Sequence, residues 1–120
     1  MPGTNSASEF VASALTTFAY NKHMVDRSIT QLSDSQLHEA LASETNSIAV
    51  LMKHMSGNLI SRFTDFLYAD GEKPWRDRDD EFVDTFTTRD EMLDYWNRGW
   101  AVMIEAIEHL SWALGVAHVV

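Results

Sequence analysis

The stretch His-Met-Ser-Gly-Asn, from His54 to Asn58, carries the residue types best suited to chemistry. Neutral imidazole is the commonest protein ligand for transition metals. On a helix, Asn58 would lie one turn after His54, where its amide could hold a neighbouring group or a water molecule. The same geometry places His54 at the flank of an apolar stripe, which favours a half-buried histidine at a helix contact. The spacing alone leaves both interpretations open.

A metal site would need further ligands, since three or more protein donors are usual. The other histidines are His23, His38, His109 and His118, and no two histidines lie four residues apart on one helical face. Glu105 and Glu108 flank His109 but fit the solvated side of a helix. The chain has no cysteine, which excludes disulfides, Cys-ligated metals and a thiol nucleophile. The sequence assigns no catalytic residue.

A second notable segment, residues 72–82, reads Glu-Lys-Pro-Trp-Arg-Asp-Arg-Asp-Asp-Glu-Phe. It could form a lid or rim, with Trp75 as an apolar anchor and Arg76 or Arg78 binding an anion. Asn58, Trp75 and Arg76 are then candidates for substrate binding. The alternative is a structural loop pinned by Trp75, with arginine–carboxylate pairs that contribute only about 0–1 kcal/mol each.

Hydrophobic periodicity predicts an all-α bundle that forms a single domain over the whole chain, residues 1–120. We expect long helices over about 8–32, 47–68 and 88–110, and a short helix that ends near 41. The connection over about 69–88 is long for a compact domain, and its aromatic residues predict that it folds back and packs. The tail, residues 111–120, is apolar, and its conformation is not predicted.

Several residues predict where these helices begin and end. Ser33 with Gln36, and Thr88 with Glu91, have the spacing of capping boxes. Gly71 is suited to the left-handed position that follows a helix.

The second long helix carries the main apolar stripe of the chain, and some small residues on another side. The stripe comprises Ile48, Leu51, Met52, Met55, Leu59, Phe63 and Phe66. Gly57 and Ser61 lie on the same side as His54, where small residues would let a neighbouring helix approach closely. Trp96 and Trp100 share one face of the last long helix and are expected in the core.

The charge balance argues against nucleic-acid binding. The formal net charge is -9, from 18 acidic and 9 Lys or Arg residues, whereas nucleic-acid binding needs a concentrated positive patch. No signal peptide is visible, and the longest nearly continuous apolar run, residues 48–52, is far short of a membrane span. We therefore expect a soluble, cytoplasmic protein that acts on neither nucleic acids nor membranes.

The run from Ser47 to Leu59, followed by Asp-Gly-Glu-Lys-Pro-Trp-Arg-Asp-Arg-Asp over residues 70–79, resembles the DinB-like (YfiT-like) superfamily. More narrowly, it is similar to an uncharacterised bacterial branch of that superfamily, over about residues 9–110. The resemblance implies an up-and-down four-helix bundle, often dimeric. It also implies a divalent metal, such as zinc or nickel, held by three histidines. Characterised relatives include thiol-dependent S-transferases and a maleylpyruvate isomerase.

His54 matches the family's metal ligand on the second helix. The other two family ligands form a His-x-x-x-His pair on the last helix, and this chain contains no such pair. The comparison with the family pattern also leads us to expect that the last family helix is short or missing. One hypothesis is a metal-dependent hydrolase or transferase, or a remnant with an incomplete metal site that includes His54. The alternative is a non-catalytic bundle that acts through homodimerisation, because a missing helix would leave an apolar groove for a second copy.

Overall fold

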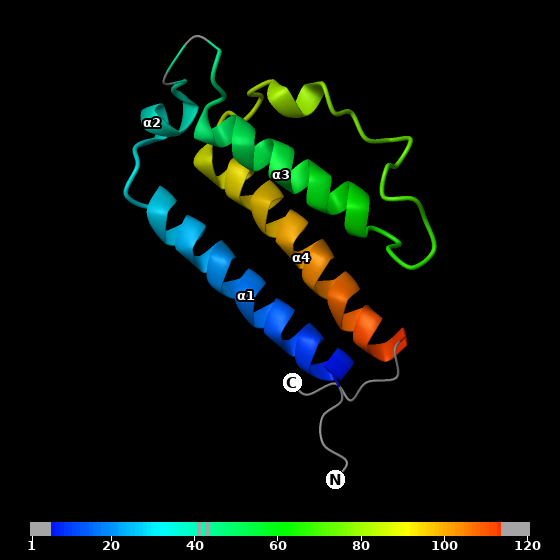
Figure 1. The fold of residues 1–120 in the computed structure, drawn as a ribbon. Helices are drawn as coiled ribbons and strands as arrows, with labels where there is room; N and C mark the ends of the chain where they lie inside the picture. The colour runs from blue at the N-terminus through cyan, green and yellow to red at the C-terminus, as the bar shows by residue number, and fades with distance from the viewer. Residues whose placement is uncertain (1–5, 41, 43, 114–120) are drawn as a thin grey trace.

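The computed structural model describes residues 6–40, 42 and 44–113. Within these residues every regular element is helical, which confirms the predicted all-α class (Figure 1). The elements are α1 (Ser6–Ile29), α2 (Asp34–His38), α3 (Ile48–Phe63), the single 3-10 turn η1 (Asp80–Phe82) and α4 (Arg89–Ala113). None of the helices in this part of the chain combines the length and hydrophobicity that crossing a membrane requires.

The long helices lie side by side, with α4 between α1 and α3 (Figure 1). Arg89, at the start of α4, donates to the carbonyl oxygens of Ile29 and Leu32, at 2.9 and 2.5 Å, so α4 begins where α1 ends and runs antiparallel to it. By contrast, α3 and α4 run in the same direction (Figure 1). The up-and-down prediction is therefore wrong for α4. Parallel neighbours need a long crossover connection, and residues 64–88 supply it.

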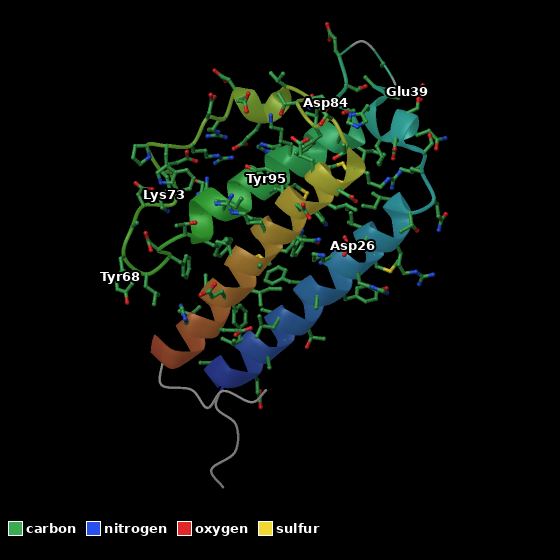
Figure 2. The ribbon with its side chains drawn as sticks, turned by 180° about the vertical axis from the view of Figure 1, so that it is seen from behind. Asp26, Glu39, Tyr68, Lys73, Asp84 and Tyr95 are labelled. Atoms are coloured by element: carbon green, nitrogen blue, oxygen red, sulfur yellow. The ribbon has the colours of Figure 1, made fainter. Side chains whose placement is uncertain are left out.

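Trp96 and Trp100 of α4 belong to the core, as predicted. Trp96 is 1% exposed and Trp100 is 6% exposed, and their rings meet edge to face with centroids 5.4 Å apart. The Nε1–H of Trp96 donates to Asp26 on α1 at 2.9 Å, which joins the two helices (Figure 2). The cluster also contains Val11, Ile29, Leu37, Ala49, Met52, Met92, Met103 and Ile107.

The contact between α3 and α4 depends on Gly99. A β-carbon at this position would lie 3.0 Å from the Cα and 3.1 Å from the carbonyl oxygen of Ser56. Because these are backbone atoms, only glycine allows the two helices to approach this closely.

The short helix confirms its predicted capping box and corrects its predicted end. Ser33 Oγ accepts from the Gln36 N–H at 3.1 Å, while Gln36 Oε1 accepts from the Ser33 N–H at 2.8 Å. The helix ends at His38 and not near residue 41. The preceding helix, α1, begins two residues before its predicted start and ends at Ile29, before the predicted residue 32.

The end of α3 differs most from the prediction, since the helix stops at Phe63 and not near residue 68. Thr64 caps it, with its N–H donating to the Ile60 carbonyl oxygen at 3.0 Å. Asp65 then takes the left-handed conformation, with φ of 51°. The left-handed position predicted for Gly71 therefore belongs to Asp65, one of the few residue types besides glycine that tolerate it.

The start of α4 is capped much as predicted. Thr88 Oγ1 accepts from the Glu91 N–H at 3.1 Å. The Glu91 carboxylate accepts hydrogen bonds from Thr87 and not from Thr88. The Thr87 N–H donates at 3.2 Å and the Thr87 hydroxyl at 2.9 Å. The helix continues to Ala113, so the first residues of the predicted tail are helical. The remainder of that tail, residues 114–120, lies outside the described residues.

The apolar stripe of α3 is only partly used in the core. Met52 is buried, but Leu51 and Met55 are 47% and 43% exposed, and Phe66 lies in the connection beyond the helix at 40%. The predicted stripe is therefore divided between the core and the surface. One side of α3 remains an open apolar surface.

Candidate functional site

The connection between α3 and α4 folds back along α3, as predicted, and its first anchor is the buried Lys73. The Lys73 ammonium donates to the carbonyl oxygens of Ser61 and Asp70, at 2.6 and 2.5 Å, and Figure 2 shows Lys73 beside the C-terminal end of α3. Ser61 Oγ donates in turn to the Gly71 carbonyl oxygen at 2.7 Å. The connection therefore packs against the small residue Ser61, where the sequence predicted the close approach of a neighbouring helix.

A second buried lysine, Lys53, anchors the other end of the connection. Its ammonium donates to the carbonyl oxygens of Asp80 and Val83, at 2.8 and 2.9 Å, and to Thr85 Oγ1 at 2.8 Å. It also reaches the Asp80 carboxylate at 3.1 Å. A buried charge is tolerated where it is paired and hydrogen-bonded in this way.

Between these anchors lies a cluster of three charged or polar side chains, His54, Glu81 and Arg76. His54 Nδ1 lies 2.9 Å from Glu81 Oε1. Arg76 donates to the same carboxylate through Nε at 2.8 Å and through Nη2 at 3.0 Å. The side chains of Glu81 and Arg76 are only 6% and 2% exposed, whereas that of His54 is 31% exposed. A buried ion pair therefore supports a partly accessible imidazole.

Gly57, one turn after Lys53, makes room for this cluster. A β-carbon at Gly57 would lie 2.4 Å from Glu81 Oε2 and 2.7 Å from Glu81 Cδ. The glycine therefore faces the Glu81 side chain. The prediction that Gly57 admits a neighbouring helix is wrong, because the close helix contact is made by Ser56 and Gly99.

The environment keeps Glu81 ionised. Its burial opposes ionisation and alone would raise its pKa, but the hydrogen bonds from Arg76 and His54, with their charges, outweigh burial and hold the pKa of Glu81 below its usual value. The hydrogen bond to Glu81 is the main reason that the pKa of Arg76 is raised. Both members of the pair are thus charged at neutral pH.

An ionised Glu81 fixes the proton of His54. A carboxylate only accepts hydrogen bonds, so Nδ1 must carry the hydrogen that it donates to Glu81. In the neutral imidazole, the free lone pair then lies on Nε2. Phe82 stacks on the ring, with centroids 4.6 Å apart and planes 28° apart, and further restricts its orientation. The result is an oriented imidazole that can accept a proton or coordinate a metal through Nε2.

Tyr95 on α4, labelled in Figure 2, is close enough to this cluster for the charges of Glu81 and Arg76 to affect its pKa. Its burial, followed by the negative charge of Glu81, raises the pKa of Tyr95, while Arg98 and Arg76 partly oppose the change. Tyr95 therefore remains a neutral phenol, able to donate or accept a hydrogen bond.

The other predicted site residues are placed less favourably for binding a substrate. Asn58 Oδ1 accepts from Arg62 Nε at 3.1 Å. Arg76 is buried and already paired with Glu81 and Glu72, so it does not present a free guanidinium to an anion. Trp75 is 57% exposed and does not pin the connection. The anchors are the buried charged side chains described above.

The residues that sequence reasoning missed are Lys53 and Glu81. Lys53 follows the apolar residues Leu51 and Met52, and nothing in that pattern distinguishes a buried lysine from a surface one. Glu81 ends an acidic run, in which the one distinguishing signal is its apolar neighbour Phe82. The contacts that Lys53 and Glu81 make depend on how the connection runs along α3. The hydrophobic periodicity of the sequence does not predict that path.

The described residues supply one imidazole suited to a metal but not a complete metal site. No group of three or more His, Asp or Glu side chains close enough to share a metal ion occurs among them. A similar histidine–carboxylate pair, His38 with Asp84, lies at the N-terminal end of α3. Its carboxylate is more exposed, at 26% against 6% for Glu81.

Comparison with known proteins assigns the chain to a family without an assigned function. The model of the family described as "Protein of unknown function (DUF1572)" matches residues 5–114, nearly the whole chain, and the chain therefore belongs to this family. No curated protein and no solved structure matches it.

Proposed function

From its membership of this uncharacterised family and from the geometry at His54, we propose that the chain is a DinB-like protein in which His54 Nε2 is one donor to a divalent metal, zinc or nickel. The observation that carries the proposal is the hydrogen bond from His54 Nδ1 to the buried Glu81. Metal-binding histidines almost always donate their second nitrogen to a carboxylate, a carbonyl group or water, which fixes the tautomer and the ring orientation.

In this arrangement each residue of the cluster has a separate task. Glu81 holds the hydrogen on Nδ1, Arg76 keeps Glu81 ionised, and Phe82 restrains the ring. Further donors must come from outside the described residues of one chain, and we propose a second copy as their source. A metal held there would polarise a substrate group or activate a thiol or water, as expected for a hydrolase or transferase.

The test is the metal content of protein purified without a metal-affinity step, measured by elemental analysis together with the mass in solution. We expect stoichiometric zinc or nickel, its loss in His54→Ala, and a metal affinity about 10- to 100-fold lower in Glu81→Gln. His38→Ala is the matched control, because it removes a histidine paired with a more exposed carboxylate and should leave the metal content unchanged. Wild-type protein that remains metal-free after incubation with zinc and nickel would refute the proposal.

A second candidate function, a non-catalytic bundle that acts through homodimerisation, is favoured by the open side of α3. Ile48, Leu51 and Met55 lie at helical steps of three and four, and all are exposed. Contiguous exposed apolar side chains of this kind often mark an interface.

Light scattering across a concentration series tests this candidate. Leu51→Lys should convert a dimer into a monomer without unfolding it, since Leu51 is already exposed. Met24→Lys, at an equally exposed apolar residue of α1, is the control. A wild-type monomer at every concentration would exclude the dimer and, with it, the second copy as the source of metal donors.

A further inference from the structure

A groove unrelated to the His54 cluster lies between the turn after α3 and the C-terminal half of α4. Its volume is about 700 Å³, within the range of small-molecule sites. The apolar part of its lining includes Phe63, Phe66, Tyr68 and Val102. Phe63 and Phe66 face each other as a tilted pair, with centroids 5.3 Å apart. Figure 2 shows Tyr68 on the connection just beyond the end of α3.

The charged groups of this groove are acidic. Asp65 lines it from the turn and Glu105 from α4. Within the described part of the chain, neither carboxylate forms a hydrogen bond or ion pair through its side chain. His109 follows Glu105 by one turn and adds a hydrogen-bonding imidazole to the lining.

Two observations define the ligand that such a lining would take. Aromatic faces attract cations, and carboxylates add to that attraction. Among the described residues, the acidic groups and His109 do not form a group of three side chains close enough to share a metal ion. We propose that this groove binds an organic ammonium ion with an apolar body, the body against the aromatic rings and the ammonium group near Asp65 and Glu105.

The conformation of the turn allows a clean test of the carboxylates. Asp65 has a positive φ of 51°, a conformation that asparagine adopts as readily as aspartate. Asp65→Asn therefore removes the charge without straining the backbone. Glu105→Gln does the same on an exposed helical position, because glutamate and glutamine have similar helix propensities.

The experiment is a titration with three probes that share one apolar body: phenylbutylammonium, phenylbutanol and phenylbutyrate. Binding is followed calorimetrically and through the NMR ring signals of His109 and Tyr68. We expect the ammonium probe to bind most tightly, and Asp65→Asn and Glu105→Gln each to weaken it about two- to fivefold. Asp94→Asn, which removes one exposed carboxylate from α4 outside the groove, is the control for the general negative charge of the protein and should leave the affinity unchanged.

Equal binding of the ammonium and alcohol probes would overturn the proposal, as would the absence of binding. An equal loss in Asp94→Asn and Glu105→Gln would also overturn it, since the attraction would then come from the overall charge. Because the groove shares no residue with the His54 cluster, these outcomes are independent of the metal content.

Discussion

Replacing Glu81 by glutamine should destabilise the protein far more than the same change at Glu72, although both side chains pair with Arg76. Glu81 accepts hydrogen bonds from His54 and twice from Arg76, at 2.8 to 3.0 Å, and is almost fully buried. Glutamine offers one carbonyl oxygen in place of two carboxylate oxygens and turns an amide toward the remaining donors.

The magnitude follows from the bonds lost. A hydrogen bond to a charged group contributes about 1.5–3 kcal/mol, and removing one partner of a buried ion pair costs about 3–5 kcal/mol. Arg76 retains Glu72 at 3.1 Å, and the desolvation cost of the Glu81 carboxylate disappears. We therefore expect the free energy of unfolding to fall by about 2–4 kcal/mol in Glu81→Gln. Glu72, whose side chain is 44% exposed, should contribute only about 0–1 kcal/mol.

Urea unfolding followed by circular dichroism measures both variants on the same scale. The two losses should differ by at least about 1.5 kcal/mol, with similar m-values, since the surface exposed on unfolding is unchanged. If Glu81→Gln and Glu72→Gln lie within about 0.5 kcal/mol of each other, the inference that burial strengthens the Glu81 pair is refuted.

The pH dependence of the same difference provides an independent check. Because the pKa of Glu81 is lower in the folded state, its contribution is fully present above the unfolded pKa of about 4.3 and is lost as pH falls through the folded value. The stability advantage of wild type over Glu81→Gln should therefore be constant at neutral pH and shrink below about pH 4. A difference that stays constant throughout this acidic range would show that the Glu81 charge is not responsible.

Three further substitutions test the packing around α3 and α4 in unfolding experiments. Gly57→Ala should cost about 1–3 kcal/mol despite the better helix propensity of alanine, because its β-carbon would displace Glu81; a gain in stability would contradict this contact. Gly99→Ala should cost a similar amount, because its β-carbon meets the backbone of Ser56; a neutral effect would mean that the helices separate easily. Trp100→Phe should leave the free energy of unfolding within about 1 kcal/mol of wild type, because the lost volume is offset by removal of a buried Nε1–H that has no partner among the described residues; a loss of about 3 kcal/mol or more would contradict this offset.

The sequence was most informative where local chemistry determines the structure. The capping box at Ser33 and the cap at Thr88 depend on side chains bonding to nearby backbone groups, so spacing is sufficient to predict them. The burial of Trp96 and Trp100 was predicted correctly because a helical face with two large aromatic residues is seldom left exposed. The all-α class follows from the same periodicity.

The sequence was least informative where a distant segment determines burial. The helical pattern continues beyond Phe63, but Asp65 reverses the chain in a conformation that no spacing rule demands of it. Lys53 and Glu81 are buried only because the connection lies against α3. The sequence predicts His54 as a candidate metal ligand but does not predict the carboxylate that it contacts, because the separation of His54 and Glu81 in sequence carries no helical signal.

Three sides of α3 have different surroundings. This difference allows the two functional hypotheses to be tested separately. Ser56 meets α4, His54 meets the connection, and Leu51 with Met55 remains open. If a second copy supplies the missing metal donors, Leu51→Lys must abolish both the dimer and the metal, whereas His54→Ala abolishes the metal alone. Elemental analysis and light scattering on both variants decide the matter: metal retained in a Leu51→Lys monomer would place the remaining donors within one chain.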